Sequence, residues 1–178
     1  MTSGPGEQEF FPVNIAVLTV SDSRTPETDK SGQILVERIS DSGHHLAARD
    51  IVIDDRDAIT AKLRTWIDDP EVDVVIATGG TGVTGRDVTP EAFHSVYEKE
   101  IPGFGELFRW ISFQKIKTST IQSRATGGVA GETYLFALPG SPGACRDAWD
   151  EILVHQLDIR YRPCNFVELM PRLNEHLD

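Results

Sequence analysis

The sequence contains few of the residues that cross-link small proteins or hold structural metals. Its 178 residues include two cysteines, Cys145 and Cys164, and neither belongs to a CxxC or Cys/His ligand spacing. This scarcity argues against a disulfide scaffold and a structural zinc site, and it favours a reduced, cytoplasmic protein. A chain of this length buries about 70% of the surface that its unfolded form exposes, so one core needs no covalent cross-link.

Basic charge and long apolar runs are also scarce. The chain has 17 Lys and Arg against 28 Asp and Glu, a net charge of −11. Nucleic acids and anionic membranes favour a basic face, so we expect neither as a partner. No segment approaches the ~20 apolar residues of a membrane span. Residues 1–12 also lack the regions of a signal peptide. An anionic ligand must therefore be held by a local group of residues.

Strand and helix patterns alternate along the chain. Apolar β-branched runs predict strands, and apolar residues at helical spacing predict the helices between them. We expect strands at 13–20, 46–53, 72–77 and 133–138, a glycine-broken edge segment at 127–132, and helices around 34–43 and 59–67, from 89, around 102–113 and from 144. This order predicts an α/β fold with three layers, a mostly parallel sheet with helices on both faces and a short antiparallel edge. We expect one domain over residues 13–170, a disordered tail over 1–12 and a C-terminal tail over 171–178.

The most informative stretch is the glycine-rich loop Thr78–Gly82, directly after the predicted strand at 72–77. Glycine permits positive φ and close backbone approach, so N–H groups of this loop can converge on an anion, with the Thr78 and Thr81 hydroxyls nearby. Thr89 and Pro90 are typical of a helix N-cap and first position. That helix would point its positive end at the loop. The pattern predicts a phosphate cradle, and a ligand-free strand-to-helix turn is the alternative.

Three separated motifs resemble the molybdopterin-binding family. They are the loop 78–82 with its continuation Gly85-Arg86-Asp87-Val88-Thr89-Pro90-Glu91-Ala92, the pair Ser123-Arg124, and Leu138-Pro139-Gly140-Ser141-Pro142. The resemblance covers about residues 13–166, and the segments 104–109, 118–124 and 162–166 resemble the B subgroup, a relative of MogA and the gephyrin G domain.

This resemblance implies an activity, ligands and an assembly. Members of the family are α/β proteins that form trimers, or hexamers in the B subgroup. Active members transfer AMP from ATP onto the terminal phosphate of molybdopterin, with magnesium. The resemblance thus implies molybdopterin as substrate, ATP as co-substrate, Mg²⁺ as cofactor and a homo-oligomer. The aromatic residues Phe104, Phe108, Trp110 and Phe113 are a possible interface.

The resemblance also implies roles for single residues. Asp87 takes the catalytic carboxylate position after the loop, and Asp54 takes the second, so that both would hold magnesium. Because Ile53 replaces the proline usual before that position, Asp55 is the alternative to Asp54. The implied ligand-binding residues are Thr78, Gly79, Gly80, Thr81, Gly82, Arg86, Ser123, Arg124, Pro139, Gly140 and Ser141, with Asp22 and Ser23 as weaker candidates.

Chemistry supports this assignment independently. Moving an adenylyl group between phosphates needs charge neutralisation and in-line positioning more than a protein nucleophile. Magnesium takes one or two protein carboxylates besides phosphate and water, so two aspartates at two strand ends suffice. Arg86 would clamp a phosphate or pair with a nearby acid, and Arg124 would contact the ligand or form an inter-subunit ion pair. A non-catalytic molybdopterin-binding or carrier module is the alternative to the adenylyltransferase. A generic nucleotide-binding domain is disfavoured, since the chain has neither GxxxxGK[ST] nor a strand-linked GxGxxG.

Overall fold

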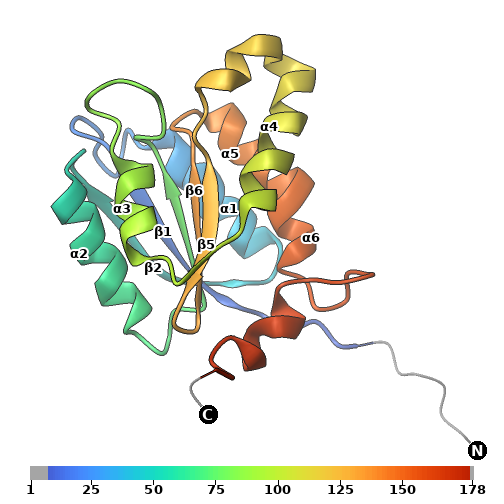
Figure 1. Ribbon diagram of the computed structural model, residues 1–178. Helices are drawn as coiled ribbons and strands as arrows, with labels where there is room; N and C mark the ends of the chain where they lie inside the picture. The colour runs from blue at the N-terminus through green and yellow to red at the C-terminus, as the bar shows by residue number, and fades with distance from the viewer. Residues whose placement is uncertain (1–7, 177–178) are drawn as a thin grey trace, which may run out of the picture.

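A six-stranded sheet lies between two layers of helices in the computed structural model (Figure 1). The structure describes residues 8–176, so residues 1–7 of the predicted N-terminal tail and residues 177–178 lie outside it. The strands are β1 Asn14–Val20, β2 His45–Val52, β3 Val74–Thr78, β4 Lys99–Glu100, β5 Thr126–Ala130 and β6 Thr133–Leu138. Their order is β2-β1-β3-β6-β5-β4, with parallel pairing from β2 to β6 and antiparallel pairing of β6 with β5 and of β5 with β4. This arrangement confirms the predicted mostly parallel sheet with an antiparallel edge.

Helices cover both faces of the sheet, as predicted. The helices are α1 Lys30–Asp41, α2 Arg56–Ile67, α3 Thr89–Val96, α4 Pro102–Ile116, α5 Pro142–Ala148 and α6 Val154–Gln156, with 3-10 helices η1 Lys117–Gln122 and η3 Val167–Arg172 and a π-helical turn η2 Trp149–Leu153. Helices α2 and α3 lie on one face, and α1, α4, α5 and α6 lie on the other (Figure 1).

Two buried clusters fill the spaces between the three layers. Alternate residues of β1 enter opposite clusters, because successive side chains of a strand point to opposite faces. Ile15 and Val17 pack with residues of α1, α4 and α5, whereas Ala16 and Leu18 pack with residues of α2 and α3. The strand is therefore apolar throughout, which is why its sequence is a continuous hydrophobic run.

Three local expectations are corrected by the structure. The segment at β5 is not an edge, because the two-residue strand β4 pairs with it and forms the edge. Thr89 is the first residue of α3 rather than its N-cap, and Val88 occupies the cap position without a side-chain hydrogen bond. Phe104 and Phe108 are core residues with 3% and 1% exposure, so they are not available to an interface.

Within residues 8–176, no helix has both the length and the apolar character required to cross a membrane.

The carboxyl ends of three parallel strands meet at one edge of the sheet. Thr19 of β1 is in register with Thr78 of β3, which is in register with Leu138 of β6. The loops that follow these strands therefore start side by side. Ligands of open α/β sheets bind at this edge.

Candidate functional site

The loop after β3 requires glycine for its shape. Gly79 and Gly80 have φ of +106° and +66°, values that side-chain-bearing residues rarely adopt. A Cβ on Gly79 would lie 2.2 Å from the backbone oxygen of Val20, so the loop also passes very close to the end of β1. Within residues 8–176, the N–H groups of Gly80 and Thr81 make no hydrogen bond. These two donors are free to meet an anion.

Two carboxylates lie against this loop. A Cβ on Gly80 would be 2.8 Å from Asp54 Oδ1, and a Cβ on Gly82 would be 2.8 Å from Asp87 Oδ2. Asp22, in the loop after β1, accepts a hydrogen bond from the Asp54 backbone N–H at 3.0 Å. The loops after β1, β2 and β3 thus bring Asp22, Asp54 and Asp87 to the same end of the sheet.

The neighbouring Asp55 has a different task. Its carboxylate accepts a hydrogen bond from the Ala58 N–H at 2.8 Å and caps α2. An N-cap of this kind stabilises a helix by about 1 kcal/mol. Asp54, by contrast, has a buried Oδ1 with no hydrogen-bond partner among the described residues. Asp54 is therefore the aspartate with capacity for a ligand.

The pKa values of the two carboxylates beside the loop, Asp54 and Asp87, are shifted in opposite directions. Burial, and then the charges of Asp22 and Asp87, raise the pKa of Asp54, and Arg86 only partly opposes them. Burial also acts to raise the pKa of Asp87, but hydrogen bonds from Thr84 and from the Gly82 backbone outweigh it, so the pKa of Asp87 is lowered. Asp87 Oδ2 accepts from the Thr84 N–H at 2.9 Å and from its hydroxyl at 2.7 Å. A cation here would relieve the electrostatic cost at Asp54.

A cavity of about 410 Å³ brings most of the predicted residues together. Its wall contains Gly80, Thr81, Gly82 and Asp87 on one side, and Ser123 with Pro139, Gly140 and Ser141 on the other. Sequence reasoning missed the part of the wall that comes from α4, η1 and α5, namely Phe108, Ser112, Ile116, Ser119, Gln122 and Ala144. The motif 118–124 marks η1 in the sequence, but the α4 residues follow an ordinary helical pattern that carries no signal of a ligand.

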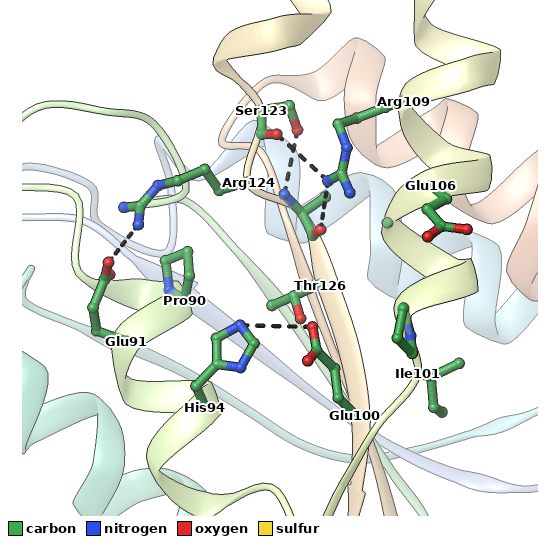
Figure 2. Close-up of a pocket in the computed structure, with 13 residues that line it drawn as sticks. Pro90, Glu91, His94, Glu100, Ile101, Glu106, Arg109, Ser123, Arg124 and Thr126 are labelled. Atoms are coloured by element: carbon green, nitrogen blue, oxygen red, sulfur yellow. Dashed lines mark hydrogen bonds and ion pairs between the residues drawn. The ribbon is translucent and has the colours of Figure 1, made fainter.

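Four predicted ligand residues have other contacts in this structure. The Thr78 side chain is buried and donates to the Pro139 carbonyl at 2.9 Å, so its hydroxyl ties β3 to the loop after β6 and does not face the cradle. Arg86 forms an ion pair with Asp22. Ser23 is exposed, and its N–H donates to Ser21 Oγ at 3.2 Å. Arg124 lines a second cavity of about 530 Å³ between α3 and α4, where it pairs with Glu91 (Figure 2).

Fold and site together define an α/β protein with a glycine loop and carboxylates at the carboxyl ends of its parallel strands. Residues 16–159 match the family described as "Probable molybdopterin binding domain", and the chain belongs to this family. The chain is 51% identical over 158 residues to molybdenum cofactor biosynthesis protein B of Escherichia coli strain K12, covering 89% of this chain and 93% of that protein. Its namesake from Bacillus subtilis strain 168 is 44% identical over 146 residues, with coverage of 82% and 86%. A crystal structure of molybdenum cofactor biosynthesis protein B superposes with a TM-score of 0.82 at 44% identity, covering 84% of this chain and 94% of that one. The resemblance to the family is confirmed.

Proposed function

We propose that this protein acts in molybdenum cofactor biosynthesis, where it binds molybdopterin and adenylylates its terminal phosphate with Mg-ATP. One observation carries the proposal: the buried, unpartnered Asp54 Oδ1 lies beside a glycine loop that has two free N–H donors. The free N–H groups suit phosphate oxygens, and the carboxylate suits a cation that neutralises them. The relatives named for cofactor biosynthesis support the choice of molybdopterin.

The carboxylates beside the loop fit a magnesium ion that takes its remaining ligands from phosphate and water. Among residues 8–176, no three His, Cys, Asp or Glu side chains come close enough to form a metal site by themselves. Magnesium bound to nucleotides uses one or two carboxylates, with phosphate and water as the other ligands. Asp54 and Asp87 would supply those carboxylates. The ion would neutralise charge on the phosphates during transfer.

The protein's own groups would bind and orient the two phosphorylated substrates. In the reaction, an oxygen of the terminal molybdopterin phosphate forms a bond to the α-phosphorus of ATP, and the bond to the β-phosphate breaks to release pyrophosphate. The N–H groups of Gly80 and Thr81 would hold phosphate oxygens in line for this exchange. Ser123 and Ser141 would donate from the opposite wall of the 410 Å³ cavity.

We also propose that the protein is a homo-oligomer. Five apolar side chains of α4 and η1 that the core leaves uncovered support this: Leu107, Trp110, Phe113, Ile116 and Ile121. Large apolar side chains left exposed on one helix and the turn after it are typical of an interaction surface.

The direct test is product formation. Purified protein is incubated with molybdopterin, ATP and magnesium, and adenylyl-molybdopterin is sought by mass spectrometry. We expect product from wild type and from the control Asp41→Asn, whose side chain is exposed, and none from Asp87→Asn. Tight molybdopterin binding by wild type without product would refute the adenylyltransferase in favour of a non-catalytic binding or carrier module.

A further inference from the structure

We propose that Arg124 and Glu91 form a positioning pair that holds the loop carrying Asp87, and that Arg124 does not bind the substrate. The inference rests on the proposed function, because it assigns these residues a place in that reaction. Nothing in the sequence separates the two roles, since an arginine near a phosphate cradle is equally suited to a ligand phosphate. The contacts of the side chain separate them.

Arg124 binds three carbonyl groups of one loop. Its backbone N–H donates to the Thr81 carbonyl at 3.0 Å. In its side chain, Nε donates to the Gly82 carbonyl at 2.7 Å and Nη2 donates to the Asp87 carbonyl at 2.8 Å. The planar guanidinium suits such a task, because its donors point in fixed directions. These contacts span both ends of the segment 82–87.

The remaining nitrogen of the guanidinium anchors the loop to a helix. Arg124 Nη1 forms an ion pair with Glu91, in the first turn of α3, and hydrogen bonding to Arg124 lowers the pKa of Glu91. The next two residues of α3, Ala92 and Phe93, are fully buried in the core. Glu91 therefore connects Arg124, and through it the loop, to a fixed element.

The direction of the Arg124 side chain agrees with this role. Figure 2 shows Arg124 and Glu91 facing each other at the cavity between α3 and α4. Gly80, Thr81, Gly82 and Asp87 line a different cavity, whose wall contains Ser123 but not Arg124. A substrate phosphate at the loop would meet the backbone that Arg124 holds, and not the guanidinium itself.

A lysine could not replace these contacts. Its ammonium is a point charge, so it can keep the ion pair with Glu91 or meet one carbonyl, but it cannot reproduce the fork. The Asp87 carboxylate would keep its bonds to Thr84 while the backbone beneath it moves. A misplacement of about 1 Å in a catalytic group can reduce turnover roughly 100-fold.

The test compares Arg124→Lys, Glu91→Gln and the double variant with wild type, and uses Glu106→Gln as a matched control. Glu106 lines the same outer cavity and has no part in the proposed reaction. We expect Arg124→Lys to lower kcat by roughly 10- to 100-fold with KM for molybdopterin nearly unchanged, and Glu91→Gln to lower it less. The double variant should equal Arg124→Lys, because Glu91 acts on the loop only through the guanidinium that Arg124→Lys already removes. A raised KM for molybdopterin with unchanged kcat would overturn the proposal and make Arg124 a ligand residue.

Amide hydrogen exchange keeps this inference separate from the proposed reaction. We expect the amides of residues 80–88 to exchange faster in Arg124→Lys and Glu91→Gln than in wild type or Glu106→Gln, without any substrate present. If wild type forms no product, the proposed reaction fails, and the exchange of residues 80–88 still decides the positioning role. Unchanged exchange in both variants would refute the pair, whatever the activity.

Discussion

Asp54 combines two features that cost folding free energy, a buried oxygen without a hydrogen bond and two neighbouring carboxylates. We expect Asp54→Asn to abolish adenylylation and to stabilise the fold, because the exchange removes the buried charge. Stabilising exchanges of this kind are commonly worth about 1 kcal/mol, or roughly 2–4 °C in melting temperature for this chain length. Thermal denaturation at neutral pH, followed by circular dichroism, measures the effect.

Asp87→Asn is the control, and we expect it to change the melting temperature in the opposite direction. Asp87 accepts hydrogen bonds from Thr84 that favour its charged form, so the amide should lower the melting temperature while also abolishing turnover. Two inactive variants that shift stability in opposite directions would separate function from folding. An equal loss of stability in both would mean that Asp54 is an ordinary structural carboxylate.

At the residue scale, the sequence predicts which loops meet at the candidate site, but it does not predict the direction in which each side chain points. The glycines are predictable because the loop needs residues that adopt positive φ, and Asp87 is predictable because it follows those glycines at a fixed distance in the sequence. Thr78 and Arg124 could not be assigned this way, because one spacing is compatible with a hydroxyl or guanidinium that faces a ligand or faces the backbone. Their directions depend on the Pro139, Gly82 and Asp87 carbonyls, which only the folded chain brings near.

At the element scale, the loop after β3 offers two glycines with opposite requirements. Gly80 has positive φ, and a Cβ there would meet Thr89 Oγ1 at 2.4 Å and Asp54 Oδ1 at 2.8 Å, whereas a Cβ on Gly85 would meet nothing within 4 Å. We expect Gly80→Ala to cost about 1–3 kcal/mol of unfolding free energy and to abolish molybdopterin binding. Gly85→Ala should be neutral or stabilising by up to about 1 kcal/mol.

Urea denaturation and a molybdopterin titration of both variants check this prediction. Because the two substitutions add the same methyl group to one loop, a general effect of lengthening a side chain there cancels. Equal behaviour of Gly80→Ala and Gly85→Ala would show that the turn tolerates a side chain at Gly80, and the cradle would then need another explanation.

Strands and helices were predictable where their own residues determine them, and not where contacts with distant segments do. The strands β1, β3 and β6 were predictable because each is buried on both faces and so reads as a continuous apolar run. The strand β4 was not, since Lys99 and Glu100 are both exposed and form a strand only through their pairing with β5. Phe104 and Phe108 share a helical pattern with Trp110, and the pattern alone cannot say which of its faces meets the sheet.

At the scale of the whole molecule, His44 connects the segment before β1 to the π-helical turn η2. Its Nδ1 accepts a hydrogen bond from the Val13 N–H at 3.2 Å, and its ring packs against Trp149 with 6.1 Å between centroids. Burial, only partly opposed by the charge of Asp158, lowers the pKa of His44 to about 4 from 6.5. His44 is therefore neutral in the folded protein at physiological pH.

The sign of the resulting pH dependence follows from proton binding. Between pH 6.5 and 4 the unfolded chain binds the proton and the folded chain does not, so the stabilisation is present above pH 6.5 and is lost as the pH falls toward 4. We expect this group to account for a loss of about 3 kcal/mol across that range. The His44→Asn variant should have a lower free energy of unfolding than wild type at pH 7, but it should lose less of that free energy when the pH is lowered. Urea denaturation at pH 7 and pH 4.5 compares the two proteins, and parallel losses would contradict the prediction.

The proposed homo-oligomer is a prediction about the whole molecule, and the apolar side chains of α4 and η1 make it testable. Trp110 is 65% exposed and Ile121 is 81% exposed, so a contact between copies would bury large side chains that the monomer leaves in water. We expect Trp110→Glu to convert the oligomer to monomer, because the interface would have to bury an unpaired carboxylate. Phe11→Glu, at a side chain that is 52% exposed elsewhere, is the control for surface charge. Light scattering after size-exclusion chromatography measures the mass.

Net charge gives the same prediction a second readout. Each copy would bring a net charge of −11 to the proposed oligomer, so mutual repulsion would oppose the apolar contact and would be screened by salt. Wild type should therefore dissociate at a higher protein concentration in 10 mM salt, where the Debye length is about 30 Å, than in 150 mM salt, where it is about 8 Å. An oligomer held mainly by ion pairs would respond in the opposite direction. If Trp110→Glu keeps the wild-type mass at both salt concentrations, α4 is not the interface.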